Sequence, residues 1–299
     1  LAWEKKHIFS GWVALGRAEE LSRPRQMKAY PLGPSSVLVA RGDDGVVRGF
    51  QNACRHRGHE LLSCDAGAEA RAIVCPYHAW SYRLDGSLIG APGHKDAEHF
   101  DPADYPLFNV EVVEWHGWLF ANGGTDKPFA DHVEGLDEVV ANYDGVDLVT
   151  AETHEYDVDA NWKVIVENYQ ECPHCTRVHP ELVAVIPLYR TGWVVDLSRD
   201  DGGVAIEGDY STGYAPGHAM PPLPGLSELD INSYYGCTAF PNMFVDISGT
   251  CAVVTSLFPK GPHLTTLVME FMFAPEVIAG PDFDPTPIVE FNELVAAQD

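Results

Sequence analysis

The sequence predicts an α+β fold with two domains, on three observations. Residues 9–121 contain short runs of β-forming residues separated by turn residues, which is typical of a small all-β domain. From residue 129 onward, helical and strand-like segments follow one another, which indicates an antiparallel sheet with flanking helices. The Gly- and Pro-containing run at 123–128 indicates a connecting loop. We therefore expect one domain at residues 8–125 and a second at residues 126–299.

The individual elements follow from local patterns. Expected strands of the first domain lie at residues 36–40, 45–50, 72–75 and 115–121. In the second domain, an amphipathic stretch precedes a strand, and four further strand-like segments lead to a terminal stretch with helical spacing. In order, these segments are residues 132–143, 151–159, 234–240, 243–247, 252–258, 265–274 and 291–299. Residues 213–224 are rich in proline and glycine and predict a mobile loop over the active site.

Composition restricts the partners. The 299 residues, 45% of them apolar, leave room for two domains and a substantial core. The net charge is −25, so binding to nucleic acid phosphates is electrostatically opposed, whereas cationic ligands or a basic redox partner would be attracted. No apolar run approaches the length of a membrane span, and no signal peptide is visible at residues 1–13. Seven cysteines without a disulfide pattern indicate a cytoplasmic protein.

Two half-motifs carry the first chemical signal. Cys54-Arg55-His56 and Cys75-Pro76-Tyr77-His78 together give C-x-H-x18-C-x2-H. Zinc sites favour C-x2–4-C paired with H-x3–5-H, which these halves do not follow, although a Cys2His2 zinc site is the alternative. One cysteine and one histidine per half suit a two-iron cluster in which both cysteines bind one iron and both histidines the other.

Both half-motifs, with their flanking residues, resemble the Rieske [2Fe–2S] family. The halves extend to Arg57-Gly58 and to Ala79-Trp80, and the glycine-containing turn that usually follows is present as Asp85-Gly86. Ala79 stands where the family more often has glycine. The resemblance implies a small all-β Rieske domain in which Cys54, His56, Cys75 and His78 hold the cluster, with Tyr77 and Trp80 shielding it from water.

A second segment contains two histidines that suit a mononuclear iron site. In Glu171-Cys172-Pro173-His174-Cys175 and the following His179, two imidazoles and a nearby carboxylate match the two-histidine, one-carboxylate triad of non-haem Fe(II). On an ideal helix, residues five apart point about 140° away from each other. His174 and His179 therefore converge only if the helix is interrupted, and Pro173 favours such an interruption.

In its wider context, this segment resembles the catalytic-domain motif of Rieske non-haem iron oxygenases. The match covers Asn161, Trp162, Lys163, Glu167, Asn168, Glu171, His174 and His179. The resemblance implies a helix-grip catalytic domain, iron ligation by the two histidines, and a catalytic role for Asn168. It also implies that Glu171 is the inter-subunit electron bridge between a Rieske histidine and a neighbour's iron-ligand histidine. Glutamate at that position is similar to the branch that oxidises quaternary ammonium compounds such as carnitine, glycine betaine and stachydrine, whereas Pro173 departs from the usual tyrosine.

The third iron ligand is expected near the end of the sequence. The stretch 291–299 resembles the family's late helix, in which the aspartate of a Gln-Asp pair completes the triad, so Asp299 is the candidate, ahead of Glu293 and Glu290. The sequence opens with Leu1 and stops at that aspartate, and we expect both ends to be truncated. An alternative remains for the C-x2-C pair Cys172 and Cys175, which with the two histidines would form a zinc site.

The resemblance also implies an enzyme system. Oxidising an inert C–H bond with O2 takes two electrons, which a Rieske cluster delivers one at a time. The chain has no G-x-G-x-x-G dinucleotide motif and no ferredoxin cysteine run, so a separate NAD(P)H-dependent flavin and iron–sulfur reductase is expected. Electrons that cross to an adjacent subunit imply a head-to-tail homotrimer.

Three functions stay open on the sequence alone. The first is hydroxylation or N-demethylation of a quaternary ammonium compound held in an aromatic box drawn from Tyr189, Trp193, Tyr214, Tyr234 and Tyr235. The second is hydroxylation or dihydroxylation of an aromatic acid, whose carboxylate Arg177 or Arg190 would bind. The third is a Rieske electron carrier, or a zinc-binding structural protein, without oxygenase activity.

Overall fold

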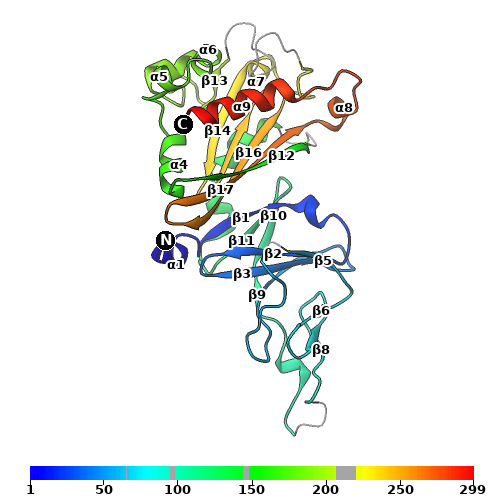
Figure 1. Cartoon of the computed structure of the whole chain (residues 1–299). Helices are drawn as coiled ribbons and strands as arrows, with labels where there is room; N and C mark the ends of the chain where they lie inside the picture. The colour runs from blue at the N-terminus through cyan, green and yellow to red at the C-terminus, as the bar shows by residue number, and fades with distance from the viewer. Residues whose placement is uncertain (65, 95–97, 144–147, 207–219) are drawn as a thin grey trace. The chain divides into compact units, whose positions relative to one another are not determined.

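The computed structural model describes residues 1–64, 66–94, 98–143, 148–206 and 220–299 (Figure 1). The chain divides into two compact units, residues 1–132 and 133–299, so the division falls shortly after the boundary expected at residue 125. Most of the expected loop at 213–224 lies outside the described residues.

Unit 1 is built almost entirely of short strands. Three antiparallel sheets have the orders β1-β11-β10, β5-β2-β3-β4-β9 and β6-β7-β8. The elements are α1 (Ala2–His7), β1 (Trp12–Arg17), η1 (Ala18–Leu21), β2 (Gln26–Leu32), β3 (Ser35–Arg41), β4 (Val47–Gln51), β5 (Gly67–Glu69), β6 (Ile73–Val74), β7 (Ser81–Tyr82), β8 (Leu88–Gly90), η2 (Pro102–Asp104), β9 (Asn109–Val110), β10 (Val112–Trp115), β11 (Trp118–Asn122) and α2 (Phe129–His132).

One apolar cluster joins the small third sheet to the central five-stranded sheet. Phe50 of β4 and Tyr82 of β7 are completely buried in it, together with Trp80 and the thiols of Cys54 and Cys75. Gly86 in the turn before β8 has a left-handed backbone, and a Cβ there would lie 2.5 Å from the Phe50 ring. The expected Asp85-Gly86 turn therefore requires glycine at position 86, both for the left-handed backbone and for the close packing on Phe50.

Unit 2 is a six-stranded antiparallel sheet with flanking helices, of order β12-β17-β16-β15-β14-β13. Helix α9 lies across one face of the sheet, and α4, α5 and α6 lie together to one side (Figure 1). The elements are α3 (Leu136–Val140), η3 (Ala141–Tyr143), β12 (Val149–Val158), α4 (Trp162–Tyr169), α5 (Cys175–Val178), α6 (Leu182–Val185), η4 (Pro187–Thr191), β13 (Val204–Ala205), α7 (Glu228–Ile231), β14 (Ser233–Ala239), β15 (Met243–Ile247), β16 (Ala252–Gly261), β17 (Leu264–Phe273), α8 (Pro275–Ile278) and α9 (Thr286–Gln298).

The expected strands of unit 2 are confirmed. Two other expected elements are each divided into shorter ones, a strand of unit 1 and the amphipathic stretch at the start of unit 2. The stretch 115–121 is the end of β10, a turn and most of β11, because His116 and Gly117 both have positive φ. The amphipathic stretch 132–143 contains only the short α3 and η3, since Gly135, also with positive φ, sets the start of the helix. Both interruptions lie at left-handed residues, which end regular hydrogen bonding.

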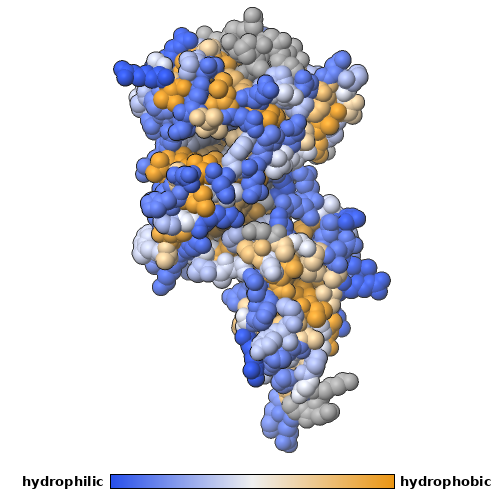
Figure 2. Space-filling model, in the orientation of Figure 1, coloured by the Kyte–Doolittle hydropathy of each residue, from blue (hydrophilic) through white to orange (hydrophobic). Residues whose placement is uncertain are grey.

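Apolar surface is limited on the face that Figure 2 shows, where apolar residues appear in patches between hydrophilic ones. Among the described residues, no helix combines the length and the apolar character that crossing a membrane requires.

Candidate functional site

Two similar loops of unit 1 present the C-x-H and C-x2-H residues. The Cys54 N–H donates to the carbonyl of His59, and the Cys75 N–H donates to the carbonyl of Trp80. In each loop, the cysteine carbonyl accepts from a left-handed residue four positions later, which is Gly58 in one loop and Ala79 in the other. The two half-motifs thus fold into matching tight turns.

The four donor side chains fit a cluster with two cysteine and two histidine ligands. Cys54 and Cys75 are buried free thiols. The Nδ1 atoms of His56 and His78 are buried, and neither has a hydrogen-bond partner among the described residues. The two imidazole rings lie 4.8 Å apart between centroids. Buried polar atoms without partners are costly, and ligation of a metal centre would satisfy both nitrogens at once.

Three aromatic side chains surround these ligands. Trp80 is buried and stacks on His56 with 4.9 Å between ring centroids, as expected of a residue that shields the cluster. Tyr77 packs on His78 but is 57% exposed, so it covers the site only in part. The sequence analysis missed Tyr82, whose hydroxyl oxygen lies 3.2 Å from Cys54 Sγ. That oxygen accepts from the Arg55 N–H at 3.1 Å, so its proton is available to the sulfur.

The histidines of unit 2 follow an interrupted helix, as Pro173 predicts. Helix α4 begins at Asn161, whose side chain accepts from the Lys163 N–H, and ends at Tyr169. After the break at residues 170–173, His174 precedes the single turn of α5 and His179 follows it with non-helical angles. The chain can thus turn both imidazoles toward each other, and their centroids lie 5.2 Å apart. The prediction of an interrupted helix is confirmed.

The structure brings His174, His179 and Asp299 together. Asp299 Oδ1 lies 2.8 Å from His179 Nε2 and 3.6 Å from His174 Nε2. Ligands at adjacent positions of an octahedral metal, each about 2.1 Å from it, are separated by about 3 Å. The carboxylate oxygen therefore lies at distances from the two nitrogens that are compatible with neighbouring ligands of one such metal.

The opposite ring nitrogens of both histidines are held in place. His174 Nδ1 donates to Glu171 Oε1 at 2.9 Å, and His179 Nδ1 donates to Gln298 Oε1 at 3.0 Å. Gln298 in turn donates to Glu181 Oε2 at 2.8 Å. In the neutral imidazoles these contacts hold the proton on Nδ1, so Nε2 is the nitrogen that can bind a metal. The sequence indicated Gln298 only as the neighbour of Asp299, and its contact with His179 is new.

Of the other predicted ligands, the two carboxylates lie elsewhere, whereas Cys175 lies with His174 and His179, their ligand atoms all within 4.8 Å of one another. Glu293 of α9 accepts hydrogen bonds from His154 and Tyr156, and Glu290 is exposed, so neither carboxylate lies on the two histidines. Cys175 Sγ lies 3.8 Å from His174 Nε2, but Cys175 is bonded to Cys172 in a disulfide. A disulfide offers no thiolate, so a Cys2His2 zinc site requires its reduction.

The residues predicted to bind substrate are spread over several environments. Tyr189 and Tyr234 lie near each other, with 6.3 Å between centroids. Trp193 is 57% exposed, and Tyr214 lies outside the described residues. Asn168 lies on the last turn of α4, and Arg177 and Arg190 are exposed.

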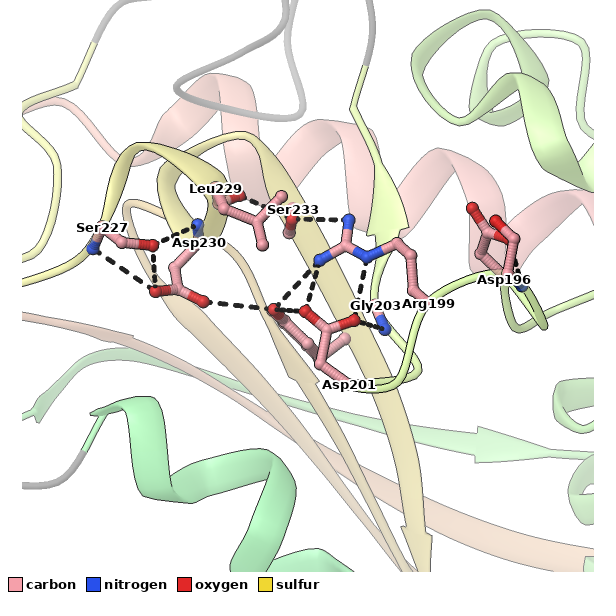
Figure 3. Close-up of polar contacts among 10 residues, drawn as sticks. Asp196, Arg199, Asp201, Gly203, Ser227, Leu229, Asp230 and Ser233 are labelled. Carbon is pink, nitrogen blue, oxygen red and sulfur yellow. Dashed lines mark hydrogen bonds and ion pairs between the residues drawn. The ribbon is translucent and has the colours of Figure 1, made fainter.

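Tyr235 takes part instead in a partly buried polar network, whose members Arg199, Asp201 and Asp230 are labelled in Figure 3. Its hydroxyl contacts Asp201 at 3.0 Å and Asp230 at 3.2 Å. Arg199 forms two hydrogen bonds with the Asp201 carboxylate and a third with Ser233. Because Asp230 also caps α7 through Ser227, this network ties β14 to α7 and to the segment that precedes β13. Its side chains are occupied by one another, which favours a structural role for Tyr235.

Comparisons with known proteins agree for both units. Residues 146–299 match the family described as ring hydroxylating alpha subunit (catalytic domain), and residues 11–101 match the Rieske [2Fe-2S] domain.

Similar proteins include oxygenase subunits. The carnitine monooxygenase oxygenase subunit of Acinetobacter baumannii is 39% identical over 59% of this chain and 48% of its own length. The glycine betaine monooxygenase oxygenase subunit of Chromohalobacter salexigens is 29% identical over 95% of this chain and 71% of its own. The chain thus spans about half the length of the first relative.

Solved structures show the same fold. The quaternary ammonium Rieske monooxygenase CntA, in complex with an inhibitor, superposes with a TM-score of 0.70 at 25% identity, over 99% of this chain and 80% of that one. A naphthalene 1,2-dioxygenase mutant superposes with the same TM-score at 22% identity, over 98% of this chain and 72% of that one.

Proposed function

Because this chain belongs to the ring-hydroxylating alpha subunit family and contains a Rieske domain, we propose that it is the terminal oxygenase component of a multicomponent system. The reaction is O2-dependent hydroxylation or N-demethylation of a small quaternary ammonium compound. One observation carries the proposal, namely the convergence of His174 Nε2 and His179 Nε2 on Asp299 Oδ1. Two imidazoles and one carboxylate are the ligand set of non-haem iron oxygenases, and they leave positions open for O2.

Each protein group then has a defined task. Cys54, Cys75, His56 and His78 would hold the [2Fe–2S] cluster, and His174, His179 and Asp299 a mononuclear Fe(II). When bound, the two centres supply stored electrons and O2 activation. Gln298 fixes the tautomer of His179, and Glu171 does the same for His174.

Glu171 is also the proposed link between subunits. Its side chain is 49% exposed while one carboxylate oxygen accepts from His174. The second oxygen can therefore accept from a histidine N–H of another copy, as the bridging role requires. This supports a head-to-tail homotrimer, with an NAD(P)H-dependent flavin and iron–sulfur reductase as the electron donor. A cytoplasmic location belongs to the same proposal, because iron ligation requires Cys54 and Cys75 as thiols, whereas the Cys172–Cys175 disulfide does not fit a reducing compartment.

Two arguments support the substrate class. The similar proteins from Acinetobacter baumannii and Chromohalobacter salexigens are named for carnitine and glycine betaine, which are both quaternary ammonium compounds. Arg177 and Arg190 are both exposed, so neither lies in an interior pocket where it could bind the carboxylate of an aromatic acid.

Metal analysis and a product assay test the proposal. Anaerobically purified protein should contain three irons and two acid-labile sulfides per chain, and His174→Ala should remove one iron while retaining the sulfide. With a reductase, trimethylammonium compounds should release formaldehyde if they are demethylated, or give a hydroxylated product, whereas aromatic acids should not react. Zinc without sulfide, or turnover of aromatic acids alone, would contradict the proposal. An unchanged iron content in His174→Ala would indicate an electron carrier.

A further inference from the structure

A carboxylate lies inside the catalytic unit with no role in the reaction described above. Asp246 is on β15, directly across from Gly236 of β14. Its neighbours Val245 and Ile247 are buried, and Asp246 as a whole residue is partly buried. The carboxylate thus belongs to the interior of unit 2.

Two tyrosine hydroxyls hold this carboxylate. Tyr169 donates to Asp246 Oδ1 at 2.7 Å, and Tyr234 donates to the same oxygen. A Cβ at position 236 would lie 3.0 Å from the Tyr234 hydroxyl and 3.2 Å from the Tyr169 hydroxyl. Gly236 therefore makes the room in which both hydroxyls meet the acid. Since Tyr169 ends α4, Asp246 is tied to the element that leads to Glu171 and His174.

Aromatic rings surround the same place. Tyr169 stacks on Phe244 with 3.9 Å between ring centroids and an interplanar angle of 3°. Tyr189 meets the edge of Tyr234 at 6.3 Å. Aromatic rings therefore make up much of the surroundings of the acid, and the Tyr189 hydroxyl and the thiols of Cys237 and Cys251 also lie near it.

The charge of Asp246 has no compensating cation among the described residues. Within the part of the chain that the structure describes, its hydrogen bonds come from the two neutral tyrosines, and no Lys, Arg or His there forms an ion pair with it. Burial raises the pKa of Asp246 to about 6, although the hydrogen bonds from Tyr234 and Tyr169 lower it. At neutral pH the group is still mainly ionised, so a negative charge is kept in a poorly solvated place. An uncompensated buried charge is costly and is a common mark of a binding site.

We propose that Asp246 is the group that selects a cationic substrate, by pairing its carboxylate with the ammonium head. This inference rests on the proposed function and names a specificity-determining residue for it. A quaternary ammonium group has no N–H to donate, so it needs a negative charge and apolar or aromatic surroundings, and a carboxylate already satisfied by two hydroxyls meets that need. The same charge repels aromatic carboxylates, which accounts for discrimination against the alternative substrates.

A pair of ligands that differ in charge alone tests this inference. Choline and its neutral isostere 3,3-dimethyl-1-butanol are titrated calorimetrically into the metal-loaded protein, held anaerobic at pH 7.5. The wild type should bind choline more tightly than the alcohol. Asp246→Asn should weaken choline binding by roughly tenfold or more and leave the affinity for the alcohol unchanged. The reason is that the variant loses the attraction between the carboxylate and an ammonium group a few ångströms away at an intermediate dielectric.

Three controls separate charge from structure. In Asp246→Asn, the amide oxygen can still accept from both tyrosines, and an unchanged thermal midpoint would verify the fold. Asp246→Glu keeps the charge and should retain the preference for choline. Asp157→Asn removes an exposed acid from β12 of the same sheet and should change neither affinity.

The outcomes distinguish this inference from the proposed function. If the wild type prefers choline and Asp246→Asn does so equally, Asp246 does not select the cation, and the proposed function stands. If the wild type binds neither ligand, or prefers the neutral one, the proposed quaternary ammonium substrate is wrong, and this inference is wrong with it. A preference that is lost in Asp246→Asn and kept in Asp246→Glu supports both.

Discussion

At the residue scale, Tyr82 is the side chain placed to tune the electronic state of the cluster. Its hydroxyl lies 3.2 Å from Cys54 Sγ, and a Cys54 thiolate that binds iron can only accept, so Tyr82 is then the donor. A hydrogen bond to a ligand sulfur stabilises the more negative, reduced cluster and so raises its potential. With a net value of about 1 kcal/mol, its loss in Tyr82→Phe should lower the one-electron potential by about 40 mV. Redox titration monitored by electron paramagnetic resonance measures the shift.

Tyr77 provides the matched control for that experiment. It lies in the loop between Cys75 and Trp80, where it packs on His78 and is largely exposed. Tyr77→Phe should therefore shift the potential far less than Tyr82→Phe. Equal potentials for Tyr82→Phe and the wild type would show that the hydroxyl does not tune the cluster.

Opposite substitutions at Ala79 and Gly58 test whether a left-handed backbone strains the residue that occupies it. Both have left-handed angles, φ +57° at Ala79 and +69° at Gly58, at equivalent places in the two loops. A Cβ at Gly58 would meet no atom within 4 Å, so the cost of a side chain there is mainly conformational. Ala79→Gly should stabilise by up to about 1 kcal/mol and Gly58→Ala should destabilise by a similar amount. The thermal midpoint for loss of the cluster's visible circular dichroism should rise in the first variant and fall in the second, and shifts of the same sign would refute the strain argument.

At the element scale, local signals in the sequence predicted the strands and the helix break, but not the contacts that complete the site. Pro173 predicted the interruption because a proline removes a backbone donor, and the longer strands of unit 2 follow their β-branched and aromatic runs. The divided segments depend on left-handed residues such as Gly135, whose angles a hydrophobic pattern does not reveal. Asp246 was missed because its partner Tyr169 is 77 positions away in the chain. Such a pairing is decided by packing of α4 against the sheet.

Helix α9 positions two groups of the iron site at its end, and Gln298 provides a test of one. Gln298→Leu removes the acceptor for His179 Nδ1–H, so the imidazole is no longer held with Nε2 toward the metal. Loss of such a contact typically weakens metal binding 10- to 100-fold. Titration with Fe(II) should show this loss, while the sulfide content stays at the wild-type value. Glu290→Gln, an exposed change on the same helix, should have no effect, and equal affinities in both variants would contradict the role of Gln298.

His154 fastens α9 to β12 in a pH-dependent way. Its ring lies between Glu152 and Glu293, with distances of 3.0 Å and 2.7 Å. The hydrogen bonds with Glu152 and Glu293 raise the pKa of His154 above 6.5, against a smaller effect of burial. Since the folded-state pKa is the higher one, this stabilisation is complete below pH 6.5 and is lost as the pH rises through the folded-state value. The group is partly exposed, so the contribution is at most about 1 kcal/mol.

Urea unfolding of the wild type and His154→Gln between pH 6 and pH 9 measures this contribution. The difference in midpoint between the two proteins should be largest at pH 6 and should shrink as the pH increases. A difference that grows with pH would mean that the ring stabilises α9 in its neutral form.

At the scale of the whole molecule, the two proposed metal sites belong to separate compact units, residues 1–132 and 133–299. Each site is complete in ligands within its own unit, since Cys54, His56, Cys75 and His78 lie in the first and His174, His179 and Asp299 in the second. A variant that disables one centre should therefore leave the other intact. This independence makes it possible to ask whether electrons pass within one chain or between chains.

Mixed oligomers of two inactive variants answer that question. Cys75→Ser should lack the cluster and His174→Ala should lack the mononuclear iron, so neither is active alone. In a head-to-tail trimer that contains both, one of the three directed interfaces joins an intact cluster to an intact iron site, so mixed trimers should recover about a third of the wild-type activity. Two affinity tags isolate the mixed trimers, and their mass verifies the assembly. Adding Glu171→Gln to the Cys75→Ser chain should abolish the recovered activity, because the proposed bridge belongs to the chain that holds the iron. Recovery of none of the activity in the first mixture would mean that electrons stay within one chain.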